Sequence, residues 1–548
     1  MKKYFLLISV TSVSLITFII GLTHYDSTNS PDFGRYFFSY NGYYVGKLNQ
    51  TGLEQGNIYF YLVSKFISLR SHLMIQPLTD EYISYNIQLV NFLIFILGMV
   101  FIYYYLKELN IDIKIITLIL IALNFFPPLY ALRLIYKPEI LLFLLFFVAL
   151  FLIEKNYNTN KTYFLYLQSI CIALMVSIKL VSAAILVVFL VFKCFMRTRN
   201  NLIRNYKKFT LVFILTFLIL SYENFLLNGH LFFDHKTPHE FQNKADFTFL
   251  FTLDIEDLLN KPYQHNFKNS AIGIILLETF DDYFNIYWNN DKSLFNIGQL
   301  SIFKMQYTTQ YLAIFLTLIF YLLVIIFSYL SKKHRFEILS PFLGIFLVIC
   351  VSFFIQFNPN TGDQIKTYYY SSFLVLAFIH LILVARVFVN IKIFILLVIL
   401  QIITASYIVG FPKEYSSNME TKIVNQLLIT DFCKVIELNI DFPNDKNCID
   451  ENNICELSFK YYLSPKFRQG MWYFKLSKPP EYLIMRNTIE SLRVNNINEC
   501  NEILLEGYKV YNNNFYNINK GPSVSIFTFF SLLVISFGKR KVSIFSYK

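Results

Sequence analysis

The sequence predicts an all-α membrane protein that crosses the bilayer about twelve times. Of its 548 residues, 55% are hydrophobic and only 15% are charged, and the mean hydropathy is +0.47. Apolar runs near 20 residues recur along the chain, the length that spans roughly 30 Å of hydrocarbon. The net charge of +12 comes mainly from Lys and Arg in short connections between these runs. This distribution is typical of cytoplasmic loops and excludes nucleic acid as the expected partner.

The candidate spans are defined by their apolar composition and length. They cover residues 5–22, 82–106, 113–132, 138–153, 163–178, 180–195, 209–227, 308–330, 336–357, 366–386, 391–410 and 522–537. Residues 163–195 form one apolar run that a single tilted helix could also explain. Dividing the run at Lys179 makes the topology consistent, so we expect two helices there.

The basic connections predict which side of the membrane each loop faces. With both termini in the cytoplasm, residues 107–114, 154–161, 193–208, 331–335, 386–392 and the tail after Gly538 lie inside. The stretch 193–208 carries six Lys and Arg residues and no acidic residue. The protein is therefore expected in the inner membrane of a bacterium, with a first helix that is an uncleaved signal anchor.

Three larger segments are expected outside the cytoplasm, at residues 23–81, 228–307 and 411–521. Residues 1–410 would form a transmembrane catalytic module, with 23–81 and 228–307 as its outer loops. Residues 411–521 are long enough for a small exported α/β or α+β domain. Residues 522–548 would add a last transmembrane helix and a basic cytoplasmic tail.

The cysteines divide between spans and the third outer segment. Three lie in or next to apolar runs, and the other four lie in the expected exported domain: Cys433, Cys448, Cys455 and Cys500. Four thiols in one exported domain indicate two disulfides of unspecified pairing. Zinc is the alternative, although Cys448 and Cys455 lack the close spacing of a zinc knuckle.

The first outer segment holds the main candidate for catalysis, Asp32, which follows the first helix closely. A carboxylate at the membrane surface can remove the proton of an acceptor hydroxyl. Arg35 lies three residues on, where it could orient that carboxylate or bind a phosphate. A helix cap is the structural alternative for Asp32. Glu54 is a possible second acid, and the amphipathic stretch 58–69 after it could lie on the membrane surface.

Three further cations stand at expected outer ends of helices. Arg133 and Lys137 flank a helix boundary and could hold a phosphate, whereas Pro138 and Glu139 have the residue types of a helix start. Lys179 interrupts an apolar run, so its ammonium group must reach the membrane surface or face a polar cavity. A polyprenyl-phosphate carrier would place its phosphate at that depth.

The second outer segment interleaves acids with aromatic residues. Asp281, Asp282 and Trp288 are typical of a sugar- or acceptor-binding cleft, where rings stack and carboxylates accept hydrogen bonds from hydroxyls. An aromatic belt at the membrane interface explains the same pattern. His235 and His239 could share a metal, although Pro238 lies between them.

Taken together, a signal-anchor-like first helix, an acid directly after it, about twelve spans and an exported C-terminal domain resemble the GT-C superfamily of integral membrane glycosyltransferases. Within that superfamily, the layout resembles bacterial relatives of protein O-mannosyltransferases and of lipid A aminoarabinose transferases. The resemblance implies that Asp32 is the catalytic carboxylate and that Lys179, in Ser177-Ile178-Lys179, is the basic residue after a small-residue helix. It also implies a polyprenyl-phosphate-linked sugar as donor and transfer on the outer face. Many relatives have two adjacent acids, whereas Phe33 follows Asp32 here, so a divalent metal remains open as a cofactor.

The sequence therefore predicts a hexosyl- or pentosyltransferase of the cell envelope that acts on an exported lipid, glycan or protein. Two other classes stay open. One is a transporter or flippase of lipid-linked glycans, and the other is a non-enzymatic assembly protein whose exported domain binds a partner.

Overall fold

The computed structural model describes residues 2–24, 27, 57–74, 80–228, 247–253, 255–260, 270–280, 302–331, 335–355 and 367–388. The expected spans at 391–410 and 522–537 and the expected domain at 411–521 lie outside these residues. Within the described ranges the chain forms helices and no strands.

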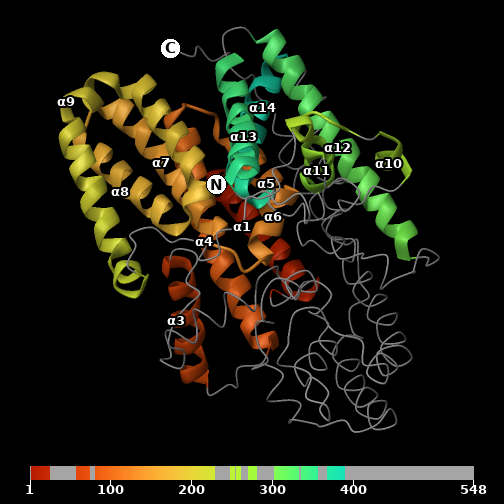
Figure 1. Ribbon diagram of the computed structural model, residues 1–548, viewed down its shortest axis with the longest axis horizontal. Helices are drawn as coiled ribbons and strands as arrows, with labels where there is room; N and C mark the ends of the chain where they lie inside the picture. Colours follow the sequence, from red (N-terminus) through yellow and green to blue (C-terminus); the bar gives the residue numbers. More distant parts are fainter. Residues whose placement is uncertain are drawn as a thin grey trace.

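The helices follow the apolar runs of the sequence. They are α1 (Lys2–His24), α3 (Asn57–Met74), α4 (Asp80–Glu108), α5 (Ile113–Asn124), α6 (Pro127–Leu134), α7 (Glu139–Thr159), α8 (Thr162–Ile178), α9 (Leu180–Asn228), η2 (Phe247–Leu250), α10 (Ile255–Asn260), α11 (Ala271–Glu278), α12 (Ile302–Leu330), α13 (Arg335–Ile355) and α14 (Thr367–Phe388). Their packing is shown in Figure 1. The amphipathic stretch at 58–69 is confirmed as a helix, α3.

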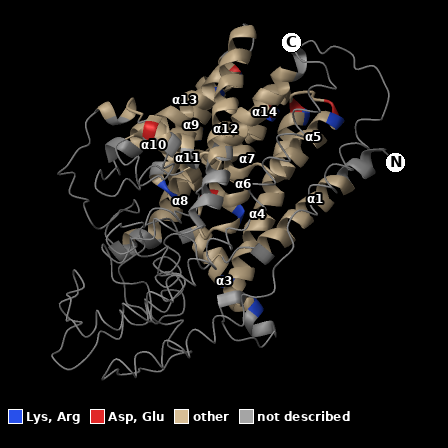
Figure 2. Ribbon diagram, turned by 90° about the vertical axis from the view of Figure 1, so that its right-hand side faces the viewer, with Lys and Arg blue, Asp and Glu red and all other residues tan. Residues whose placement is uncertain are grey.

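Three of these helices are long and apolar enough to cross a membrane: α4, α7 and α14. The bent pair α5 and α6 adds a fourth if it is one span, and α1, α8, α12 and α13 contain shorter apolar helices. Figure 2 shows how few charged residues these helices carry. The chain is therefore a helical membrane protein, and the full set of twelve spans remains a prediction.

The expected span at 113–132 is broken. α5 ends at Asn124, α6 begins at Pro127, and the two helices are bent by 56°. Pro127 and Pro128 explain the break, because proline has no N–H group and clashes with the preceding turn of a helix. Phe126 lies at the bend and stacks on Phe378 of α14, with ring centroids 4.6 Å apart. The bend thus joins α6 to the late helices.

The division of the run at Lys179 is confirmed. Lys179 has extended backbone angles between the end of α8 and the start of α9. The prediction of a loop at 193–208 is wrong, because this stretch is helical within α9. A single residue, Thr198, leaves the helical region there, with φ −128° and ψ 34°. The stretch 193–208 contains no Gly or Pro, and its long unbranched side chains favour helix, so the chain turns by a kink.

The centre of the bundle is α7, which packs against α4, α8, α9 and α14. Between Glu139 and Glu154 all of its residues are apolar, and both acids are buried. The two acids are fifteen positions apart along the helix, which corresponds to about 22 Å. We name the two ends of the bundle the Lys179 end, which holds Glu139, and the Lys193 end, which holds Glu154.

Candidate functional site

The connection between α6 and α7 is fixed by side chains from outside it. The amide of Asn91, on α4, donates to the carbonyls of Arg133 at 3.1 Å and Ile135 at 2.8 Å. Ser27 Oγ donates to the carbonyl of Leu134 at 2.5 Å. These bonds satisfy carbonyls that a helix leaves unpaired at its C-terminus. The carbonyls at this end of α6 are therefore bonded to α4 and to the chain just after α1.

Ser27 also ties this part of the chain to α4, because its backbone N–H donates to Ser84 Oγ at 2.8 Å. Asp32, five residues further along, lies outside the described residues. Ser27 itself is bonded both to α4 and to the connection between α6 and α7.

The amphipathic helix α3 reaches the same region through Tyr59. The Tyr59 hydroxyl donates to Asn91 Oδ1 at 2.9 Å, and the side chain is fully buried. Burial raises the pKa of Tyr59, the hydrogen bond to Asn91 lowers it by less, and the negative charge of Glu139 raises it further. The hydroxyl therefore stays protonated and remains a donor.

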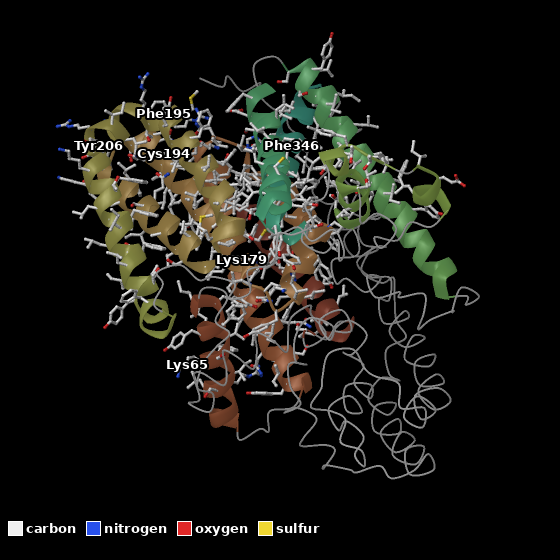
Figure 3. The ribbon with its side chains drawn as sticks, in the orientation of Figure 1. Lys65, Lys179, Cys194, Phe195, Tyr206 and Phe346 are labelled. Carbon is white, nitrogen blue, oxygen red and sulfur yellow. The ribbon has the colours of Figure 1, made fainter. Side chains whose placement is uncertain are left out.

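At the Lys179 end, a buried ion pair joins α7 to the α8–α9 break. Lys179 Nζ lies 2.6 Å from Glu139 Oε1, and the two side chains are 8% and 1% exposed. The extended backbone at Lys179 places the ammonium group at this junction (Figure 3). Buried charges of this kind are costly unless they are paired. The pair explains why a lysine is retained in an apolar run.

Two tyrosines from α14 and a second lysine surround this pair. Lys179 Nζ lies 4.4 Å from the ring centroid of Tyr369 and 5.8 Å from that of Tyr368. Lys137 Nζ lies 5.6 Å from the same Tyr368 ring. These distances are in the range of cation–π attraction. We call Lys137, Glu139, Lys179, Tyr368 and Tyr369 the Lys179 cluster.

Arg133 lies in a separate group. Its two terminal nitrogens contact Thr17 Oγ1, on α1, at 3.1 and 3.2 Å, and its guanidinium carbon lies 4.2 Å from the Phe95 ring centroid. The side chain is 2% exposed, its Nε has no hydrogen-bond partner, and no carboxylate within the described ranges pairs with it. A buried cation without a counter-charge is destabilising by several kcal/mol. An anionic ligand would remove that cost.

The sign of the change in melting temperature in Arg133→Met separates a ligand-binding role of Arg133 from a structural one. If Arg133 awaits an anion, Met keeps the packing on Phe95 and removes the unpaired charge, so the empty protein should melt higher by several degrees. Affinity for phosphate should fall at least tenfold, because a contact to the anion is lost. Thermal unfolding in detergent and a phosphate-binding assay measure the two effects. Arg133→Lys is the control that retains the charge, and a lower melting temperature for Arg133→Met would assign the residue to structure alone.

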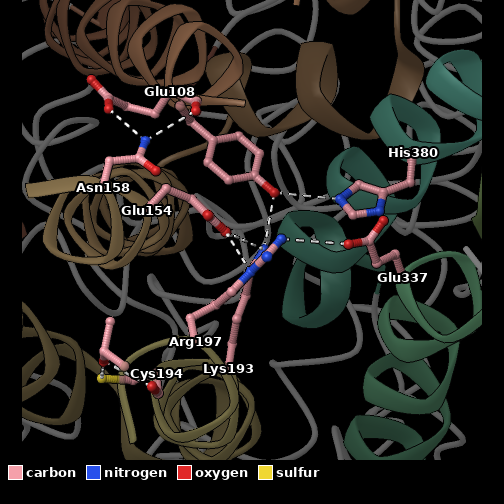
Figure 4. A network of polar contacts seen from close by, with 10 residues as sticks. Glu108, Glu154, Asn158, Lys193, Cys194, Arg197, Glu337 and His380 are labelled. Atoms are coloured by element: carbon pink, nitrogen blue, oxygen red, sulfur yellow. Dashed lines mark hydrogen bonds and ion pairs between the residues drawn. The ribbon is translucent and has the colours of Figure 1, made fainter. Parts of the chain in front are cut away.

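The Lys193 end holds a different polar network (Figure 4). Glu154 lies 3.6 Å from Lys193 and 3.5 Å from Arg197, and Arg197 also lies 3.5 Å from Glu337 on α13. Lys193 donates to the Tyr105 hydroxyl at 3.0 Å, which is 3.5 Å from His380 Nε2. Each carboxylate of this network lies near at least one cation, and the contacts tie α4, α7, α9, α13 and α14 together.

The predicted site residues divide into those that can be placed and those that cannot. Asp32, Arg35, Glu54, Asp281, Asp282, Trp288 and the four cysteines of the expected exported domain lie outside the described residues. Lys137 and Lys179 share the Tyr368 ring, whereas Arg133 lies in its own group. In the described ranges no three His, Cys, Asp or Glu side chains gather to hold a metal. Cys171, Cys194 and Cys350 lie in helices and carry no disulfide.

Sequence reasoning missed three members of the Lys179 cluster. Glu139 starts α7, as the Pro-Glu pattern predicts, but its ion pair with Lys179 was not foreseen. The sequence does place a lysine and a glutamate at the same expected depth. Because membrane-buried charges pair with each other, this coincidence could have indicated the ion pair. Tyr368 and Tyr369 sit in an apolar run, where nothing distinguishes them from a membrane-facing pair.

Comparisons of the chain with protein-family models, with curated proteins and with solved structures found no match. The function is therefore argued from the residues and their geometry.

Proposed function

We propose that this chain is a membrane glycosyltransferase that moves a sugar from a polyprenyl-phosphate carrier to an exported acceptor on the outer face of a bacterial cytoplasmic membrane. The observation that carries the proposal is the Lys179 cluster. Two lysines distant in sequence lie near one tyrosine ring, at the end of the bundle where Ser27, just after α1, bonds to Leu134.

The charges of the cluster suit a carrier phosphate. Lys137 and Lys179 place two ammonium groups near the Tyr368 ring, and ammonium groups donate to phosphate oxygens and attract their charge. A glycosyl phosphodiester carries one negative charge, so both lysines can contact its phosphate.

Asp32 performs the proton transfer in this proposal. It takes the proton of the acceptor hydroxyl as the oxygen bonds to the anomeric carbon. The bond from that carbon to the phosphate oxygen breaks, and the electron pair leaves with the carrier phosphate. Lys137 and Lys179 stabilise the charge that develops there. Whether a divalent metal assists is left to experiment.

The orientation follows from the charge distribution. Lys155, Lys193 and Arg197 lie at the Lys193 end, with the rest of the basic stretch 193–208 beside them. The positive-inside bias assigns that end to the cytoplasm and the Lys179 end to the outer face.

Lipid analysis of a strain that lacks the gene tests the proposal. We expect a polyprenyl-phosphate-linked sugar to accumulate several-fold in the outer leaflet, where a membrane-impermeant oxidant reaches its hydroxyls, and the acceptor to lack the sugar. Re-expression of the wild-type chain should reverse both changes. Accumulation in the inner leaflet would support a flippase instead, and an unchanged lipid profile would support an assembly protein.

A further inference from the structure

Glu139 has one carboxylate oxygen in use and one without a partner. Oε1 accepts from Lys179 at 2.6 Å, whereas Oε2 is fully buried and accepts no hydrogen bond in the part of the chain that the structure describes. A buried charged acceptor that stays unsatisfied is destabilising by about 1–3 kcal/mol or more. Such an atom requires an explanation.

The position of Glu139 at a helix start does not supply that explanation. An acid in the first turn of α7 opposes the helix dipole favourably, and Lys179 neutralises its charge. Both effects would also operate if Oε2 accepted a hydrogen bond from the protein. No backbone N–H or side chain of the described residues donates to Oε2, however. The oxygen can therefore accept a hydrogen bond from a ligand.

We propose that Glu139 Oε2 accepts a hydrogen bond from a sugar hydroxyl of the carrier-linked donor, and this inference rests on the proposed function. A glycosyl phosphate carries hydroxyl groups next to its phosphate. A carboxylate paired with one lysine, with a second lysine near the same Tyr368 ring, therefore matches both parts of the head group. The rings of Tyr368 and Tyr369 add faces against which a sugar can stack.

This contact distinguishes the donor from the product. After transfer, the carrier is a plain polyprenyl phosphate that has no hydroxyl for Glu139. Its phosphate has become a monoester with more negative charge, which the nearby carboxylate repels. Glu139 therefore favours binding of the loaded carrier and release of the spent one.

Ligand binding to the purified full-length protein in nanodiscs tests the inference. The probes are polyprenyl phosphate and polyprenyl-phosphate hexoses bearing glucose, galactose or mannose. The wild type should bind at least one hexose probe tenfold or more tighter than polyprenyl phosphate, as expected for a hydrogen bond to a charged group. Glu139→Gln should reduce that preference to less than about threefold.

A pair exchange separates this role from a purely structural ion pair. Glu139→Lys combined with Lys179→Glu keeps the opposite charges together, so the protein should fold, but the carboxylate moves away from the sugar. We expect the double variant to melt near the wild type and to lack the hexose preference. Restored preference in the double variant would overturn the role of Glu139, and so would equal binding of both probes by the wild type. Failure of the wild type to bind either probe would instead overturn the proposed function.

Discussion

Replacement of Asp32 by Asn should lower sugar transfer by about 100- to 10,000-fold, the contribution typical of a general base. Asn has nearly the same shape as Asp but cannot take a proton from the acceptor hydroxyl. The amount of protein in the membrane and its melting temperature should stay unchanged, because the substitution removes only one charge. Transfer is measured with membranes from cells that express each variant, with the amount of chain determined by immunoblot.

Asp26→Asn is the matched control for this experiment. Asp26 precedes the anchored Ser27 in the same outer segment, and the same change of one carboxylate to an amide should leave transfer within about twofold of wild type. Full transfer by Asp32→Asn would remove the catalytic assignment. Glu54→Gln would then become the variant to measure, since Glu54 is the other candidate acid of this segment.

Breaking the ion pair of the Lys179 cluster should have the largest effect on stability. Glu139→Leu leaves Lys179 buried without its carboxylate, and Lys179→Met leaves Glu139 without its ammonium group. Each change should destabilise the folded protein by about 3–5 kcal/mol, the range for removing one partner of a buried pair. The double variant should recover most of this loss, because no charge stays unpaired. Thermal unfolding in detergent, followed by size-exclusion chromatography, measures all three.

The pair at the other end of α7 provides a control. Lys155 lies 2.7 Å from Glu108, but the side chains are 34% and 15% exposed. Lys155→Met should cost at most about 1 kcal/mol, since water solvates the remaining acid. The double variant of the buried pair could also prove no more stable than the single variants. That result would mean that the pair does more than balance charge in the folded state.

Much of the bundle could be predicted because membrane helices follow from local composition. The ends of α4, α7, α8 and α14 lie within a few residues of the expected spans, and the division at Lys179 follows from the charge pattern. The bend before Pro127 was visible in the sequence as two adjacent prolines, yet hydropathy alone predicted one continuous span. Hydropathy averages over a window and does not register a missing N–H group.

The site could be predicted only in part, because its residues meet through helix packing. Lys179 and Tyr369 are far apart in sequence, and only the packing of α14 against α7 and α9 brings them together. Lys137 and Arg133 are four residues apart, but the end of α6 lies between them and sends their side chains to different neighbours. Sequence spacing does not determine such contacts unless both residues lie on one regular helix.

The spacing of the two acids along α7 has a consequence for the chemistry of the bundle. Their separation of about 22 Å is shorter than the roughly 30 Å of bilayer hydrocarbon. If the helix is centred in the bilayer, the Lys179 cluster lies about 4 Å below the level of the lipid carbonyl groups. A carrier phosphate that enters it leaves the hydrated head-group layer. Water is scarce at that depth, and water would otherwise hydrolyse the activated sugar. A transferase with this geometry therefore favours transfer to the acceptor over hydrolysis.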